Sequence, residues 1–235
     1  MSDHTNKQFD TEMESIRSGV LSMGGIVEQQ LARAIAALEK DEDAGRLDAV
    51  VAGEAAINGL QMTIDQQCAQ IIAKRQPAAV DLRMVLTVSK IVNDLERIGD
   101  EVKKIAYKAS ETRGSDRLAR VRAYDTARAL DDAMTMLQLA LDAFARLDAI
   151  AAAEVIGRDV HIDAAFASIL RQLVSYMMED PRTITPALEI VFIAKSIERI
   201  GDHAKNIAEA VVQVVKGKDV RHASAEAIRA EVAQP

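Results

Sequence analysis

The chain has 235 residues and a net charge of −7, and it is 49% hydrophobic but only 3% aromatic. This charge excludes a dominant basic surface for nucleic acid, and no apolar run approaches the roughly 20 residues of a membrane span. The single cysteine, Cys68, excludes an internal disulfide and cysteine zinc clusters, and we expect it to be a small buried residue. The N-terminus lacks a signal-peptide pattern, so a cytoplasmic protein is expected.

Apolar residues recur at helical spacing throughout the chain, and four prolines and eleven glycines are too few for a turn-rich β-sandwich. The expected fold class is therefore all-α, with six long helices. The first three are predicted at about 10–40, 46–74 and 79–110, and the next three at about 116–148, 151–178 and 184–216. Prolines 77, 181 and 186 fall at the junctions between helices, where a missing N–H is tolerated.

Two features modify the predicted helices. Gly24 and Gly25 lie inside the first helix and should weaken or bend it locally, because glycine is conformationally permissive. The polar tail after Gly217 should fray, because chain ends without buried residues are poorly ordered.

The two halves of the chain are copies of one unit of about 105 residues. The segment Leu95–Asp100, LERIGD, returns as IERIGD at Ile197–Asp202, 102 residues later. The apolar positions around it match at the same offset and are spaced three and four residues apart, as in an a/d seam. We therefore predict two tandem three-helix bundles, over 1–113 and 114–217, followed by a polar tail at 218–235.

The repeated segment carries an acid pair at spacing i,i+4 in each copy, Glu96 with Asp100 and Glu198 with Asp202. If Leu95 is heptad position a, Glu96 and Asp100 are positions b and f, so both pairs should lie on the outer surface. Two like charges at this spacing cost a few tenths of a kcal/mol. The repeated cost suggests a compensating multivalent cation.

The second helix of each copy adds further oxygen ligands. The second copy has Asp159 with Asp163, and the first copy has Glu54 with Asn58, one charge weaker. If these helices lie beside the repeated segment, the acids converge on one patch per copy. Such ligands suit Mg, Ca or Mn, and also iron.

Glycines 99 and 201 lie at the middle of their helices, where each costs about 1 kcal/mol against alanine. They suggest that something approaches the backbone closely at the acid pairs.

Catalytic motifs are absent from the sequence. No histidine completes the Glu-x-x-His of di-iron bundles, and there is no P-loop, GxSxG or HExxH. His161 and His203, beside the acids, are added ligands or partly exposed helix residues. Two alternatives therefore remain beside a binding protein: a carboxylate-bridged metal store or oxidase, and a structural bundle with solvated acids.

Seven basic residues against two acids lie between Lys103 and Arg122, across the junction of the copies. The stretch is either a solvated linker or a docking patch for an acidic partner. We name Arg113 and Arg117 in this stretch, with Arg97 and Arg199 in the repeated segments, as candidates for partner contacts.

The sequence resembles the PhoU family of phosphate-transport regulators over nearly its whole length. Beside the duplicated ERIGD, the resemblance rests on four groups of residues: Ile71–Pro77 with Asp81–Arg83, Glu14–Arg17, Met23–Gly25 with Val27–Gln30, and Asp142–Arg146.

This resemblance implies two similar three-helix bundles side by side, with metal ions or clusters at the acid pairs and no organic cofactor. The metal, whether Fe, Mn, Mg or Zn, stays open. It also implies a cytoplasmic regulator, often dimeric, with no enzymatic activity. Such a regulator connects the ATPase subunit of a phosphate ABC importer to a membrane sensor histidine kinase. It holds down phosphate uptake and the phosphate-starvation response when phosphate is plentiful. Asn58 departs from the doubled acid pattern.

Overall fold

A computed structural model describes residues 2–39, 44–111 and 118–233. These residues form seven α-helices and two short turns of other helix types. In chain order the elements are α1 (Ser2–Glu39), α2 (Ala44–Arg75), α3 (Ala79–Glu111), the π-helical turn η2 (Val121–Asp125), α4 (Thr126–Arg146), α5 (Ala149–Glu179), the 3₁₀ turn η3 (Pro181–Thr183), α6 (Ile184–Lys216) and α7 (Ala225–Val232).

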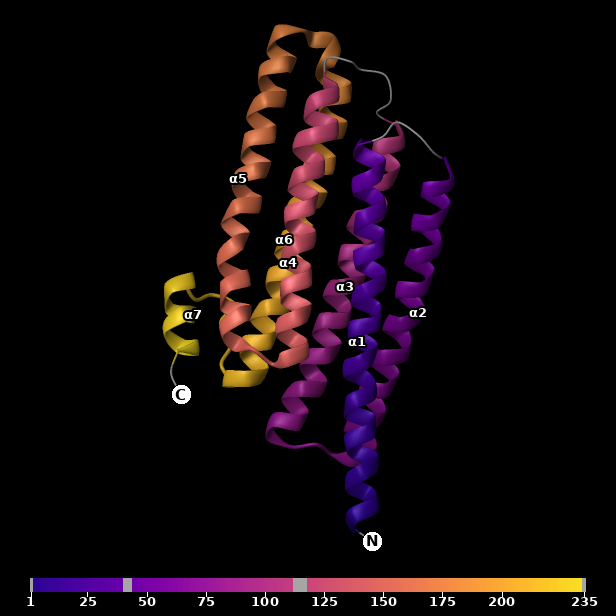
Figure 1. Cartoon of the computed structure of the whole chain (residues 1–235), viewed down its shortest axis with the longest axis vertical. Helices are drawn as coiled ribbons and strands as arrows, with labels where there is room; N and C mark the ends of the chain where they lie inside the picture. Colours follow the sequence, from indigo (N-terminus) through magenta and orange to yellow (C-terminus); the bar gives the residue numbers. More distant parts are fainter. Residues whose placement is uncertain (1, 40–43, 112–117, 234–235) are drawn as a thin grey trace.

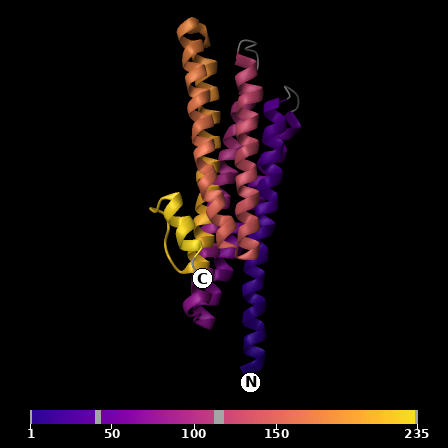
Figure 2. The same cartoon turned by 60° about the vertical axis from the view of Figure 1, so that its left-hand side comes forward.

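The helices form two elongated three-helix bundles that lie side by side, which confirms the predicted fold class (Figures 1 and 2). One bundle consists of α1, α2 and α3, and the other consists of α4, α5 and α6. The bundles meet mainly through α3 against α6, with α1 against α4 beside them. The core is aliphatic, as the composition predicts. Cys68 is buried in it, and this burial raises the pKa of its thiol to about 11.

The predicted bounds hold best for α3 and α6 and least well at the starts of α1 and α4. Helix α1 begins at Ser2 instead of about residue 10. Helix α4 begins at Thr126, after η2, instead of about residue 116. Leu118 and Val121 are both buried, as the apolar periodicity predicts. The residues from Val121 to Asp125, however, form a π-helical turn, which is wider than a turn of α-helix. Along the described residues, no helix has a stretch both long and apolar enough to cross a bilayer.

The prediction that the tail frays is wrong for most of its length. Ser224 caps α7, and its hydroxyl accepts a hydrogen bond from the backbone N–H of Ala227 at 3.3 Å. Ile228 and Val232, one helical turn apart, are buried where α7 packs on α5 (Figure 2). Two large apolar residues on one face therefore dock a short helix whose other residues are alanine, glutamate and arginine.

Helix α1 runs through both Gly24 and Gly25, so the two glycines do not end it. A Cβ atom at Gly24 would lie 2.6 Å from Cδ1 of Leu141 in α4. The missing side chain therefore lets the two bundles approach each other closely.

The glycines of the repeated segments face their own neighbouring helices. A Cβ atom at Gly99 would lie 3.1 Å from Cδ1 of Ile57 in α2, and one at Gly201 would lie 3.1 Å from Cγ2 of Ile162 in α5. The two glycine–isoleucine contacts occupy equivalent positions in the copies. The group that approaches the backbone is thus an isoleucine of the adjacent helix, and the contact brings the acid pairs of the two helices together.

We predict that Gly201→Leu destabilises the protein by about 1–3 kcal/mol, because the added side chain must displace the β-branched Ile162. Gly59→Leu is the matched control, since a Cβ atom at this exposed position of α2 meets nothing within 4 Å. It should be neutral or stabilising by up to about 1 kcal/mol. Urea unfolding measures both. Equal stability of the two variants would contradict a packing role for Gly201.

Candidate functional site

Four carboxylates of the second bundle gather between α5 and α6. Asp159 and Asp163 lie on α5, and Glu198 and Asp202 lie on α6. Burial raises the pKa of Asp202, and the negative charges of the other three raise it further. The pKa of Asp163 is raised in the same way, by burial and by the charges of Asp159 and Glu198. These acids therefore form one electrostatic unit, the second acidic cluster.

The first bundle repeats this arrangement between α2 and α3. Glu54 lies on α2, and Glu96 and Asp100 lie on α3. Burial, followed by the charges of Asp100 and Glu54, raises the pKa of Glu96. We call Glu54, Asn58, Glu96 and Asp100 the first acidic cluster.

Lysines contact both clusters. Nζ of Lys103 lies 2.6 Å from a carboxylate oxygen of Glu54, and Nζ of Lys205 lies 2.7 Å from one of Asp159. In the second cluster alone, Lys195 also contacts Glu198, at 2.6 Å. Each cluster therefore carries part of its counter-charge within the chain.

Three of the carboxylates lie deeper than the outer-surface prediction implies. Side-chain exposure is 18% for Glu96, 16% for Glu198 and 11% for Asp159. These three occupy the crevice between two helices, whereas Asp163 and Asp202 are exposed, as the pattern predicts. Heptad positions b and f lie outside the core of a bundle. The glycine–isoleucine contacts nevertheless bring the second helix close enough to cover part of these side chains.

Asn58 brings an unsatisfied oxygen to the first cluster. It stands where the second copy has Asp163, and its buried Oδ1 accepts no hydrogen bond from any described residue. Within the described part of the chain, no three His, Cys, Asp or Glu side chains are close enough together to hold a metal ion as they stand. The side chains present thus supply oxygen ligands, although the lysine pairs hold two of the acids.

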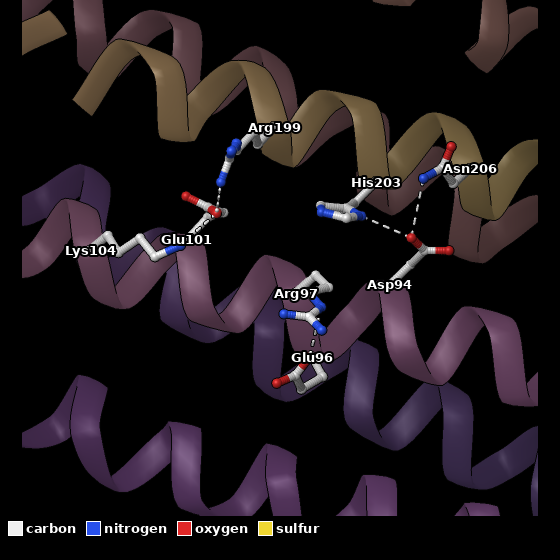
Figure 3. Close-up of polar contacts among 8 residues, drawn as sticks. All are labelled: Asp94, Glu96, Arg97, Glu101, Lys104, Arg199, His203 and Asn206. Atoms are coloured by element: carbon white, nitrogen blue, oxygen red, sulfur yellow. Dashed lines mark hydrogen bonds and ion pairs between the residues drawn. The ribbon is translucent and has the colours of Figure 1, made fainter. Parts of the chain in front are cut away.

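A second polar site, which the sequence did not indicate, joins the bundles where α3 meets α6 (Figure 3). Glu101, almost fully buried, accepts hydrogen bonds from Lys104 at 2.8 Å and Arg199 at 3.2 Å. Burial raises the pKa of Glu101, but the hydrogen bonds outweigh it and the net shift is downward. Figure 3 also shows Glu96 pointing away from α6. Asp100 and Asp202 of the acidic clusters, by contrast, line one groove together with Glu101, Arg199 and His203.

His203 belongs to this bundle contact. Its Nδ1 lies 2.8 Å from Oδ1 of Asp94, which also accepts a hydrogen bond from Asn206 at 3.2 Å. The contact with Asp94 therefore directs the ring of His203 from α6 toward α3. For this reason we do not count His203 as a further member of the second acidic cluster. His161 is exposed and lines a groove between α4 and α5.

The candidate partner-binding arginines have different environments. Arg97 and Arg199 are more than half exposed and contact Glu96 and Glu101 at 3.5 and 3.2 Å. Arg113 and Arg117 lie outside the described residues. In the same basic stretch, Lys103, Lys104 and Lys108 all pair with acids of this chain, which leaves less free positive charge than the sequence suggests.

A family model described as "PhoU domain" matches residues 20–109 and again residues 126–211, which confirms the duplication. A relative from Pseudomonas putida, named a phosphate-specific transport system accessory protein PhoU homolog, is 44% identical over 99% of this chain and 90% of its own length. The Escherichia coli (strain K12) accessory protein PhoU is 42% identical over 94% of this chain and 91% of its own length.

Two solved structures share the fold. The crystal structure of PhoU from Pseudomonas aeruginosa has a TM-score of 0.82 and 45% identity, and the match covers 89% of this chain and 100% of that one. The phosphate transport system regulatory protein PhoU from Streptococcus pneumoniae also has a TM-score of 0.82, with 26% identity over 90% of this chain and 99% of that one. The chain therefore belongs to the PhoU family, a non-enzymatic family of accessory and regulatory proteins of phosphate transport.

Proposed function

We propose that this protein is a cytoplasmic regulatory adaptor. It links the ATPase subunit of a phosphate ABC importer to a membrane sensor histidine kinase. When phosphate is plentiful, it limits phosphate uptake and represses the phosphate-starvation genes. It acts as a homodimer and does not insert into the membrane.

One observation carries this proposal: the family match includes both copies, and the relatives align over nearly their full length. A single matched copy would support only a shared domain, whereas a full-length match supports a shared role. The names of the relatives, an accessory protein of phosphate-specific transport in E. coli and a transport regulator in S. pneumoniae, give that role its content.

We further propose that each acidic cluster binds a divalent or iron-type cation. Burial, and then the charges of neighbouring acids, raise the pKa of Glu96, Asp163 and Asp202, and a cation would relieve the repulsion between these acids. Carboxylate and amide oxygens are the ligands that Mg²⁺, Mn²⁺ and Ca²⁺ prefer. The unsatisfied Oδ1 of Asn58 supports the first cluster as a site despite its missing carboxylate. A bound cation would supply positive charge that ties the two helices of each cluster together.

Arg97 and Arg199 are our candidates for partner contacts, because their guanidinium groups are more than half exposed on the face that joins the bundles. An exposed ion pair is worth about 1 kcal/mol or less, so an acidic partner can compete for these side chains.

Co-purification tests the adaptor role. The full-length protein should retain the importer ATPase and the sensor kinase from cells grown in high phosphate, and Arg97→Ala/Arg199→Ala should retain less of both. Lys216→Ala, in the last turn of α6, is the control for the loss of positive charge. Deletion of the gene should raise alkaline phosphatase expression in phosphate-rich medium. Binding to neither partner in high or low phosphate would contradict the proposal.

A further inference from the structure

Lys103 and Lys205 are equivalent residues of the two copies. The duplicated ERIGD continues as Asp100–Lys103, DEVK, in the first copy and as Asp202–Lys205, DHAK, in the second. The lysine therefore follows the last acid of the pair at the same distance in both copies. At i,i+3 it shares a helix face with that acid.

The two lysines also make the same contact. Lys103 reaches from α3 to Glu54 on α2, and Lys205 reaches from α6 to Asp159 on α5. Their side chains are almost equally exposed, at 33% and 34%, while the acids they contact are 18% and 11% exposed. The contact thus recurs with the same elements, register and depth. Each lysine occupies a carboxylate of the second helix that a bound metal ion could use to bridge the two helices. Glu54 is the only such acid in the first cluster, whereas Asp159 is accompanied by Asp163 in the second.

At two further positions the copies differ in charge, and the two differences have opposite signs. Where the first copy has Asn58 and Asn93, the second has Asp163 and Lys195. The positive charge of Lys195 partly offsets the raised pKa of Asp163. An added acid is therefore accompanied by an added lysine. Counting the cations that contact the acids, the first cluster has three carboxylates against Lys103 and Arg97 and keeps an excess of one negative charge. The second has four carboxylates against Lys195 and Lys205 and keeps an excess of two.

We propose that Lys103 and Lys205 are tethered competitors of the metal ion. This inference rests on the proposed metal binding. In the metal-free protein, each ammonium group neutralises one carboxylate of the second helix, Glu54 or Asp159. Metal binding displaces the ammonium into solvent and takes over the carboxylate. The lysine thereby weakens the metal affinity and makes the site release its metal more readily.

Mn²⁺ titration followed by electron paramagnetic resonance tests the role of Lys103, because the signal of free Mn²⁺ is lost on binding. A Glu198→Gln/Asp202→Asn background leaves the first cluster as the site observed. In this background, Lys103→Gln should tighten Mn²⁺ binding about fivefold, the effect of losing one partly exposed ion pair. Lys104→Gln is the matched control: it removes the same charge from the adjacent residue, which pairs with Glu101 outside the cluster. It should leave the affinity within about twofold.

Each result is decisive. Tighter binding by Lys103→Gln alone supports the competition, and Lys103→Arg, which keeps the charge, should bind like the unmodified background. If the background binds Mn²⁺ but Lys103→Gln and Lys104→Gln behave alike, the competition is overturned and the metal site stands. If the wild-type protein and every variant fail to bind Mn²⁺, the metal function is overturned and the competition with it.

Amine labelling gives a second measurement that needs no substitution. Reductive methylation of the wild-type protein, quantified by mass spectrometry, reports how accessible each lysine is. Addition of Mn²⁺ should raise the labelling rates of Lys103 and Lys205 severalfold and leave those of Lys104 and Lys218, which pair outside the clusters, unchanged. Unchanged rates at Lys103 and Lys205 under saturating Mn²⁺ would overturn the displacement.

Discussion

Glu198→Gln/Asp202→Asn should weaken Mn²⁺ binding at the second acidic cluster by about 100-fold or more. The variant removes both acids contributed by α6, and the affinity of oxygen-ligand sites depends strongly on the number of charged ligands. The first cluster should still bind, so the stoichiometry measured by calorimetry should fall by half. Asp131→Asn/Asp132→Asn is the matched control, because it removes two negative charges from exposed positions on α4 of the same bundle. An unchanged stoichiometry in the Glu198→Gln/Asp202→Asn protein would contradict the site.

The same variant should be slightly more stable than the wild type without metal, by a few tenths of a kcal/mol at pH 7. The pKa of Asp202 is raised in the folded state, so folding binds its proton more tightly. This carboxylate therefore lowers stability at pH values above its folded pKa. The loss disappears as the pH falls through the folded pKa toward the unfolded value, near 3.8. The advantage of the variant should shrink over that range. Residues that lower the stability of the fold in this way are typical of binding sites.

Periodicity and duplication were enough to predict the two bundles, because long amphipathic helices are determined largely by local patterns. The a/d seams of α3 and α6 extend over their whole lengths, and the predicted bounds of both helices are close to the observed ones. Helix α7 was missed because its stability is not local. Eight residues do not form a stable helix alone, and the burial of Ile228 and Val232 depends on the packing of α7 on α5, far away in the chain.

The gathering of the acids was predicted correctly in part. Spacing placed Glu198 and Asp202 on one helix face and suggested that Asp159 and Asp163 lie beside them, and the electrostatic coupling of the four agrees with this. The depth of Glu198 and Asp159 was not predictable, because it depends on how closely two helices pack at Gly201. The partner of Lys205 lies on another helix, 46 residues earlier. A signal for this lysine was nevertheless present, since the repeat extends from ERIGD to ERIGDxxK in both copies.

The bundle contact shows a further limit of sequence patterns. Glu101 and His203 stand at equivalent positions of the two copies, but one is an acid that accepts from Arg199 and the other is a histidine held by Asp94. A comparison of the copies alone marks these positions as divergent and therefore unimportant. In the structure Glu101 of the first bundle contacts Arg199 of the second, and His203 of the second bundle contacts Asp94 of the first. The difference between the two positions therefore lets two similar surfaces pair through complementary groups.

Phe144→Ala should cost about 3–5 kcal/mol of unfolding free energy. Phe144 is among the largest fully buried side chains, and it sits in α4 in a core that is otherwise built from smaller aliphatic residues. These neighbours are held in long rigid helices and have little freedom to collapse into the cavity. Phe192→Ala is the matched control, because the ring of Phe192 is 56% exposed on α6. It should cost about 1 kcal/mol or less, mainly through the contact of Lys108, whose Nζ lies 5.9 Å from the ring centre.

Urea unfolding measures this difference directly. Because α3 and α6 join the bundles along much of their length, we expect one cooperative transition in which Phe144→Ala lowers the midpoint and leaves the slope unchanged. Two separate transitions, of which Phe144→Ala shifts only the one that belongs to the bundle of α4, α5 and α6, would show that the bundles unfold independently. Equal costs for Phe144→Ala and Phe192→Ala would contradict the buried position of Phe144. A single transition would mean that a change in stability at either acidic cluster is shared by both bundles.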